Sequence, residues 1–490
     1  MRDQVVLLSI PGLRAQDIGA MPNLARLAAS GEQAALAPSF PCVTCPVQAA
    51  MTTGSLANEH GVVANGFYWR DKVEIEMWTA WNECILKPQI WDQLHDHDAS
   101  ITSAVWFPLH SKGCGADYIC TPAPIHNPDG SESLWCYTKP TELYGELRDT
   151  LGHFPLQHFW GPIANIKSSA WIVDSAIHAA RAWRPDFFYI YLPHLDYAAQ
   201  KNGPDSPEAA AAVAALDEVL GRLLTEFRKA YGLPEPLWLV ASEYAIVPVD
   251  HVTYPNRVLR QAGLLTVDAR DDGEHLDLTH SKAWAMVDHQ FSHIFVRDRD
   301  PATIRQVAEL FQGQEGVAEV LLAEGQASYG LNHERAGDVV LVSTPNSWQA
   351  YYYWLDDARA PAFARTVDIH RKPGYDPVEL FFDKATLQAM AAMAAKAKEG
   401  GQESHSKPGQ GQGAGPALSG APSGPPAGKG GMRPAPGIPL DATLVRGSHG
   451  APAREDAQRG VIVSSQPGVL IGRVLADTDV CDLVLRQFGV

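Results

Sequence analysis

The stretch that decides the fold is a proline-framed turn near the start of the chain, Pro38-Ser39-Phe40-Pro41-Cys42-Val43-Thr44-Cys45-Pro46. A helix is expected to follow it over residues 47–53, and the amino end of a helix stabilises a negative group such as phosphate. Thr44 lies in this turn just before the expected helix and is our candidate nucleophile. A threonine hydroxyl is a weak nucleophile until a metal or a base activates it. Cys42 and Cys45 have redox-pair spacing, but that chemistry belongs in a thioredoxin-like unit without such a turn.

Composition sets the class of the protein and excludes some partners. The chain has 490 residues, 46% of them hydrophobic, and a net charge of -17, which is ordinary globular composition with an acidic balance. Because this charge repels nucleic-acid phosphates and anionic membranes, we expect neither as a partner. We find no signal peptide and no membrane-spanning apolar run, and the seven cysteines are odd in number, so we expect a cytoplasmic protein with reduced thiols.

Apolar runs alternate with helical patterns through the first half of the chain. Residues 4–10 form one run, residues 187–192 follow a helical pattern, and residues 237–241 follow another. This order predicts an α/β fold with a mainly parallel sheet flanked by helices. Two of the runs end in polar clusters that contain Asp196 and Glu243, and the carboxyl ends of such strands share one crevice.

The pattern changes twice in the second half of the chain. Residues 251–399 contain shorter strand-like segments and predict a smaller inserted α+β cap, whereas residues 400–437 are rich in glycine and proline. Strand-like segments reappear after that tract, so we interpret it as a flexible loop within one domain. The predicted core therefore comprises residues 1–250 and 438–490.

Three motifs together carry a family resemblance: the turn at 38–46, His60-Gly61-Val62-Val63-Ala64-Asn65, and Gly447-Ser448-His449-Gly450. They resemble the alkaline phosphatase superfamily, in particular its nucleotide pyrophosphatase/phosphodiesterase branch. The resemblance implies an alkaline-phosphatase-like core and a phosphothreonine intermediate on Thr44. It also implies that Asn65 donates to a nonbridging phosphate oxygen. Phe67, Tyr68 or Trp69 is expected on the leaving-group side, and Tyr68 is our substrate-binding candidate.

The same resemblance implies two zinc ions ~4 Å apart, yet several ligand positions are substituted here. The chain retains Asp196 and His449 as ligands, and it has Gln200 where the resemblance expects a histidine. The second ion's ligand positions hold Pro11, Glu243 and Tyr244. Proline has no side-chain donor, and glutamine is a poor zinc ligand beside imidazole. We therefore predict one divalent ion, with zinc, magnesium and manganese left open, held by Asp196, His449 and Glu243 together with Thr44.

Other polar residues are candidates for a supporting role. His194 and His289 each lie near an aspartate in an expected strand-end turn, so either could substitute for a missing ligand. Arg371 and Lys372, in the densest polar segment of the cap, could bind phosphate directly and supply positive charge.

These features predict hydrolysis of a small-molecule phosphodiester or phosphomonoester, as in type I phosphodiesterases, through a phosphothreonine intermediate. The alternative is a noncatalytic member of the family that binds a phosphorylated metabolite or partner in the former active-site cleft. A sulfate or phosphonate ester stays open as a third substrate class, because fold does not determine function. Nothing in the sequence identifies the leaving group or a protein partner.

Overall fold

A nine-stranded sheet forms the centre of the computed structural model, which describes residues 4–126, 132–402 and 437–490. Its five central strands, from β11 to β6, are mutually parallel, whereas β22 and β9 run antiparallel to their neighbours. The strands in spatial order are β23 (Val474–Ala476), β2 (Glu32–Ala37), β22 (Gly460–Ser464), β11 (Leu237–Ala241), β1 (Val5–Ser9), β10 (Phe187–Tyr191), β5 (Ser103–Trp106), β6 (Tyr118–Pro122) and β9 (Cys136–Lys139).

Both faces of the sheet are buried, which explains why its central strands are continuously apolar. In β1, Val6 and Leu8 pack into one hydrophobic cluster, whereas Val5 and Leu7 pack into the cluster on the opposite face. This alternation follows from the two-residue period of a strand.

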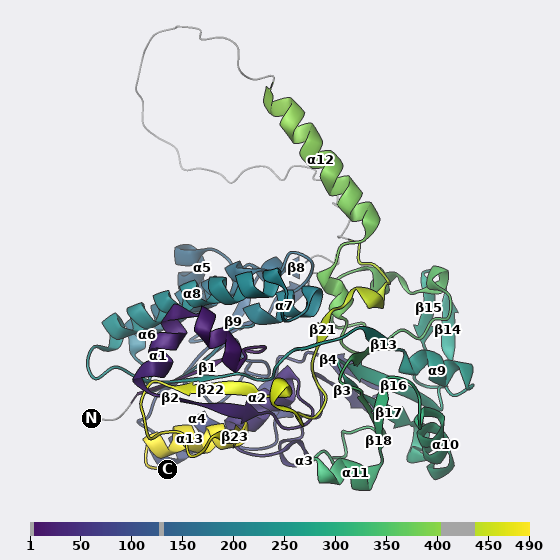
Figure 1. Cartoon of the computed structure of the whole chain (residues 1–490), viewed down its shortest axis with the longest axis horizontal. Coiled ribbons are helices and arrows are strands. Elements are labelled where there is room, and N and C mark those ends of the chain that lie inside the picture. Colours follow the sequence, from purple (N-terminus) through teal and green to yellow (C-terminus); the bar gives the residue numbers. More distant parts are fainter. Residues whose placement is uncertain (1–3, 127–131, 403–436) are drawn as a thin grey trace.

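Two layers of helices cover these faces (Figure 1). One layer contains α1 (Pro22–Ser30), α5 (Leu143–Leu151), α6 (Ile166–Trp183), α7 (His194–Asn202) and α8 (Pro207–Tyr231). The other layer contains α2 (Thr44–Thr53), α4 (Ile90–His97) and α13 (Asp479–Gln487), and the short α3 (Ala57–His60) follows α2 along the chain. This arrangement confirms the predicted α/β fold with a mainly parallel sheet flanked by helices.

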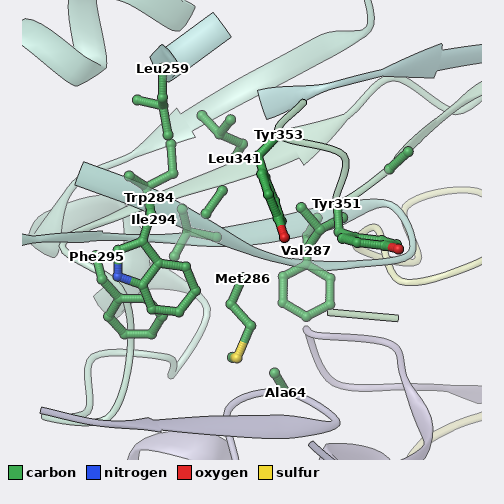
Figure 2. Packing of buried hydrophobic residues seen from close by; sticks show 14 of the residues in the cluster. Ala64, Leu259, Trp284, Met286, Val287, Ile294, Phe295, Leu341, Tyr351 and Tyr353 are labelled. Atoms are coloured by element: carbon green, nitrogen blue, oxygen red, sulfur yellow. The ribbon is translucent and has the colours of Figure 1, made fainter. Parts of the chain in front are cut away.

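A second, four-stranded antiparallel sheet lies beside the core, in the order β16 (Ala283–Asp288), β17 (Phe291–Val296), β19 (Val339–Ser343) and β18 (Val317–Leu321). The helices of this region are α9 (Pro255–Gln261), α10 (Pro301–Phe311) and α11 (Ala323–Ser328). Figure 2 shows Met286 of β16 pointing toward Ala64 of the core, and both belong to one hydrophobic cluster. The cap and the core are therefore packed together.

Short two-stranded pairs complete the described strands: β3 (Gly66–Trp69) with β4 (Glu74–Met77), β7 (Ile125–His126) with β8 (Glu132–Ser133), β12 (Val247–Pro248) with β21 (Gly447–Ser448), β13 (His251–Thr253) with β20 (Ser347–Gln349), and β14 (Val267–Arg270) with β15 (Gly273–Leu276).

The predicted glycine- and proline-rich loop lies almost wholly outside the described residues, which stop at 402 and resume at 437. Before it, α12 (Lys384–Gln402) projects away from the body of the molecule (Figure 1). Gly437 donates its backbone N–H to Thr386 Oγ1 at 3.0 Å, so the chain returns to the place where α12 begins. The domain boundaries at 250, 399 and 438 stay predictions. No helix in the described ranges is long and apolar enough to cross a bilayer.

Candidate functional site

The topology brings four distant segments to one edge of the main sheet. The carboxyl ends of β2, β11 and β10 lie at this edge and lead to Thr44, Glu243 and Asp196, respectively. Because β22 runs in the opposite direction, the segment that precedes it, with His449, reaches the same edge. This placement agrees with the rule that ligands of open α/β sheets bind beyond the carboxyl ends of the strands.

Thr44 is the first residue of α2, a buried helix of ten residues. The turn before it is tied to the late glycine motif, because Cys42 N–H donates to the Gly450 carbonyl at 3.2 Å. Gly450 has a φ of +115°, and a side chain there would press on Gln290 and Val43. The sequence therefore needs glycine at this position so that the two loops can meet. The amino end of α2 lies at the Thr44 hydroxyl, where it favours a negative group.

The Tyr244 hydroxyl lies between Thr44 and Asp196. Its oxygen is 3.0 Å from Thr44 Oγ1, and it donates to Asp196 Oδ2 at 3.0 Å. A phenol has one hydrogen, so the Tyr244 oxygen accepts the hydrogen of Thr44. Tyr244, which stands where the resemblance expects a histidine ligand, thus places a hydrogen-bonding group on the candidate nucleophile.

Two carboxyl groups of the site are buried, and neither forms an ion pair with another described residue. Glu243 Oε1 accepts from Ser9 Oγ at 2.6 Å and from Gln48 Nε2 at 2.7 Å, and burial raises the pKa of Glu243 to about 8. Burial likewise raises the pKa of Asp196 to about 7. The second oxygen of each, Glu243 Oε2 and Asp196 Oδ1, has no hydrogen-bond partner among the described residues. A nearby positive charge would stabilise the ionised form of both groups.

His449 presents a free ring nitrogen to the same place. Its Nδ1 lies 2.8 Å from the Cys42 carbonyl oxygen, which accepts only from a protonated nitrogen, so Nε2 carries the lone pair. Nε2 has no partner within the described part of the chain. Burial lowers the pKa of His449 well below its usual value and keeps the ring neutral. The ring stacks on Tyr244, with centroids 3.6 Å apart, in the tautomer that binds a metal.

The family's two-zinc centre does not fit these residues. Proline, glutamine and tyrosine stand at positions 11, 200 and 244, and Gln200 Oε1 already accepts from the Tyr375 hydroxyl at 2.6 Å. Within residues 4–126, 132–402 and 437–490, no group of three or more His, Cys, Asp or Glu side chains is arranged as a metal centre. The free donor atoms are Asp196 Oδ1, Glu243 Oε2 and His449 Nε2. These three atoms could serve one ion at most, and holding it would require them to move together.

Asn65 is held by the cap rather than by the core alone. Its Oδ1 accepts from Cys45 N–H at 3.0 Å, and its backbone N–H and Nδ2 donate to Asp288 at 2.8 and 3.0 Å. Asp288 ends β16, is fully buried, and also lies 2.6 Å from His289 Nδ1. Burial raises the pKa of Asp288 to about 6. Asp288 was not among the residues predicted from the sequence, although its place beside His289 in a strand-end turn was a usable signal.

The two candidate substitute histidines lie on different sides of the site. His289 packs against His449, with ring centroids 3.9 Å apart, and its other face stacks on Tyr375 at 3.7 Å. His194 begins α7, two residues before Asp196, but it lines a cavity between α6, α7 and α8. The structure thus brings His289 to the candidate ligands and turns His194 toward a separate space.

The three predicted substrate-binding residues make their contacts elsewhere. The Tyr68 ring packs against Trp284 and Phe295 of the cap, at 4.9 Å from each. The Arg371 side chain is 67% exposed and pairs with Asp368. The remaining candidate, Lys372, is 1% exposed, and its ammonium lies 2.8 Å from Asp376 and 2.5 Å from Glu379. A phosphate role for Lys372 would require these two ion pairs to open.

Comparison with known proteins shows which family this chain resembles. A family model described as type I phosphodiesterase / nucleotide pyrophosphatase matches residues 5–376. An uncharacterised pyrophosphatase/phosphodiesterase of Schizosaccharomyces pombe is 24% identical over 286 residues, which are 58% of this chain. The alignment spans about half, 50%, of that relative's length.

Solved structures with the same fold include two enzymes named for phosphorus chemistry. Phosphonoacetate hydrolase from Sinorhizobium meliloti, in complex with phosphonoformate, has a TM-score of 0.58 and 17% identity, and the match covers 99% of this chain and 96% of the other. Human ectonucleotide pyrophosphatase/phosphodiesterase 5 also has a TM-score of 0.58, with 12% identity and coverage of 99% and 95%. At these identities the likeness concerns the fold alone.

Proposed function

We propose that this chain, which belongs to the type I phosphodiesterase / nucleotide pyrophosphatase family, hydrolyses a small phosphate ester with Thr44 as the nucleophile. The observation that carries the proposal is the position of the Thr44 hydroxyl. It lies at the amino end of α2 and is hydrogen-bonded to Tyr244, beside the buried Asp196. A hydroxyl that has a fixed hydrogen-bond acceptor is well placed to attack phosphorus. The adjacent amino end of α2 can stabilise the negative charge that develops.

The hydrogen bonds around Thr44 define a path for its proton. As Thr44 Oγ1 forms a bond to phosphorus and the leaving-group oxygen departs, the Thr44 hydrogen moves to the Tyr244 oxygen. Tyr244 passes its own hydrogen to Asp196 Oδ2, and the leaving group departs as an aryl oxide. Water then attacks phosphorus and the bond to Thr44 Oγ1 breaks, while the proton on Asp196 returns through Tyr244 to Thr44. Phosphate or its monoester is released, and the remaining proton of the water neutralises the aryl oxide in solvent. Asn65, held by Asp288, retains a second amide hydrogen that can donate to a nonbridging oxygen.

A divalent ion would add to this proposal only if the site rearranged around it. Asp196 Oδ1, Glu243 Oε2 and His449 Nε2 each lack a partner among the described residues, but those residues are not arranged as a metal centre. If the three atoms moved together around one ion, it would supply the positive charge that a phosphate needs beside buried carboxylates. Zinc, magnesium and manganese all accept two oxygen donors and one nitrogen donor.

The alternative is a noncatalytic protein that binds a phosphorylated metabolite or partner in the same cleft. The loss of ligand atoms at positions 11, 200 and 244 favours it, because most charge stabilisation in phosphoryl transfer comes from metals and fixed donors.

Turnover of aryl phosphate esters separates the two proposals. Wild type, Thr44→Ala and Thr44→Ser are assayed on an aryl phosphodiester and an aryl phosphomonoester, with Mg²⁺, Mn²⁺ and Zn²⁺ supplied one at a time. We expect Thr44→Ala to abolish turnover and Thr44→Ser to retain part of it, because only serine keeps a hydroxyl in place. If the wild type shows no turnover under any of these conditions but still binds its ligand, the noncatalytic alternative is favoured.

A further inference from the structure

A second cavity, of about 340 Å³, lies in the helical layer on the far side of α7 from Thr44. The amino end of α6, α7 and α8 form its walls, and these helices lie together in Figure 1. Apolar side chains make up much of the lining, among them Ile166, Ala212, Ala215 and Leu380. A surface of this kind suits the apolar body of a small molecule.

One buried polar group of α7 lines this cavity without a partner. His194 is 7% exposed, and its Nδ1 makes no hydrogen bond with the described residues, whereas the Tyr197 hydroxyl interacts with Ser168. Buried polar atoms normally have partners, because an unpaired one loses its hydration without compensation. His194 Nδ1 therefore marks a place where a ligand can supply the missing hydrogen bond.

A cation with no carboxylate partner lines the same cavity. Lys201 is half-buried, and none of the salt bridges among the described residues includes it. Burial lowers the pKa of its ammonium group, as expected where no anion compensates for lost water. Its ammonium lies 5.3 Å from the centroid of the Phe381 ring. Glu208 also lines the cavity, and its negative charge disfavours a doubly charged phosphate.

We propose that this cavity binds a small organic monocarboxylate whose apolar body rests on Ala212, Ala215 and Ile166. The carboxylate pairs with Lys201, while His194 Nδ1 hydrogen-bonds to the ligand. The site is distinct from the candidate catalytic site, because His194 and Lys201 follow one face of α7 at helical spacing. Asp196 and Gln200 follow a neighbouring face, which carries contacts to Tyr244 and Tyr375.

Binding of phenylacetate to the full chain, followed by calorimetry and ligand-observed NMR, tests this site. We expect saturable binding, and about tenfold weaker binding of the neutral phenylacetamide, since a charge-assisted hydrogen bond contributes about that factor. Lys201→Met should remove the preference for the acid over the amide. The control Lys229→Met, at a surface lysine paired with Glu226, should bind as the wild type does.

Variants that fill the cavity with a large side chain test whether phenylacetate binds there. Ala215→Trp and Ala211→Trp fill the cavity from positions that retain solvent exposure, so both should fold and lose phenylacetate binding. Thr44→Ala should bind phenylacetate normally, so failure of the proposed hydrolysis leaves this inference standing. The proposal is overturned if phenylacetate does not bind, if acid and amide bind equally, or if folded blocking variants bind as tightly as wild type.

Discussion

Replacing Lys372 by methionine should strongly destabilise the protein, whereas the same change at its neighbour Arg371 should not. The Lys372 ammonium is paired with Asp376 and Glu379, and all three side chains are at most 2% exposed. Removing one partner of a buried ion pair costs about 3–5 kcal/mol, because the remaining charge stays desolvated. Arg371 pairs with Asp368 at the surface, where such a pair contributes about 0–1 kcal/mol.

The dependence of this loss on pH gives a second signature. Burial raises the pKa of Glu379 even while Lys372 pairs with it, and removing the lysine should raise it further. A carboxyl whose pKa is raised in the folded state binds a proton more readily there than in the unfolded chain, so stability falls as pH rises. The Lys372→Met variant should therefore lose more stability relative to wild type at pH 8 than at pH 5.

Urea denaturation of wild type and both variants at the two pH values measures these differences. A loss below about 1 kcal/mol for Lys372→Met would refute the argument from the buried ion pairs. A folded Lys372→Met protein with an unchanged free energy of unfolding and a raised KM for a phosphate ester would instead support the direct phosphate contact predicted from the sequence.

Three further predictions concern the site and the chain's organisation. Tyr244→Phe should lower kcat by at least about tenfold, because Thr44 and Asp196 each lose a hydrogen bond; steady-state kinetics that match wild type would exclude the proposed proton path. Elemental analysis after extensive dialysis should find at most one divalent ion per chain, and two zinc ions would show that other residues rebuild the family's centre. Replacing residues 403–436 by about twelve Gly/Ser residues, which can span the roughly 24 Å from the end of α12 back to its start, should leave melting temperature and any activity nearly unchanged, because loop shortening changes closure entropy slowly. Ending the chain at 402 removes His449 and β22 and should prevent folding, so equal tolerance of both changes would contradict the idea of one continuous core.

The sequence was sufficient for the fold because the sheet's central strands are buried on both faces. β1, β10 and β11 are uniformly apolar, and the helices between them have clear periodic patterns, so the parallel α/β architecture followed from local signals. The rule that ligands bind beyond strand ends also pointed to the edge where Asp196 and Glu243 lie. These residues keep their predicted roles as proposals.

Local sequence patterns could not predict which side chains from distant segments contact one another. Asn65 bonds to Asp288, 223 positions along the chain, and Thr44 bonds to Tyr244, 200 positions along the chain. Lys372 was predicted from its polar segment to bind phosphate, yet it is buried in ion pairs with Asp376 and Glu379. Which of two adjacent basic residues turns inward depends on tertiary packing that the sequence pattern alone does not encode.

A covalent phosphothreonine on Thr44 is the central claim, and acid-quenched mass spectrometry tests it most directly. The wild type is mixed with an aryl phosphodiester and a divalent ion, quenched during turnover and digested, and the peptide that contains Thr44 is sequenced. We predict a covalent phosphoryl adduct on Thr44 in wild type, still carrying the second alcohol of the diester, and none in Thr44→Ala, with turnover present only in the former. Turnover without this adduct on Thr44, or turnover that survives Thr44→Ala unchanged, would contradict the account.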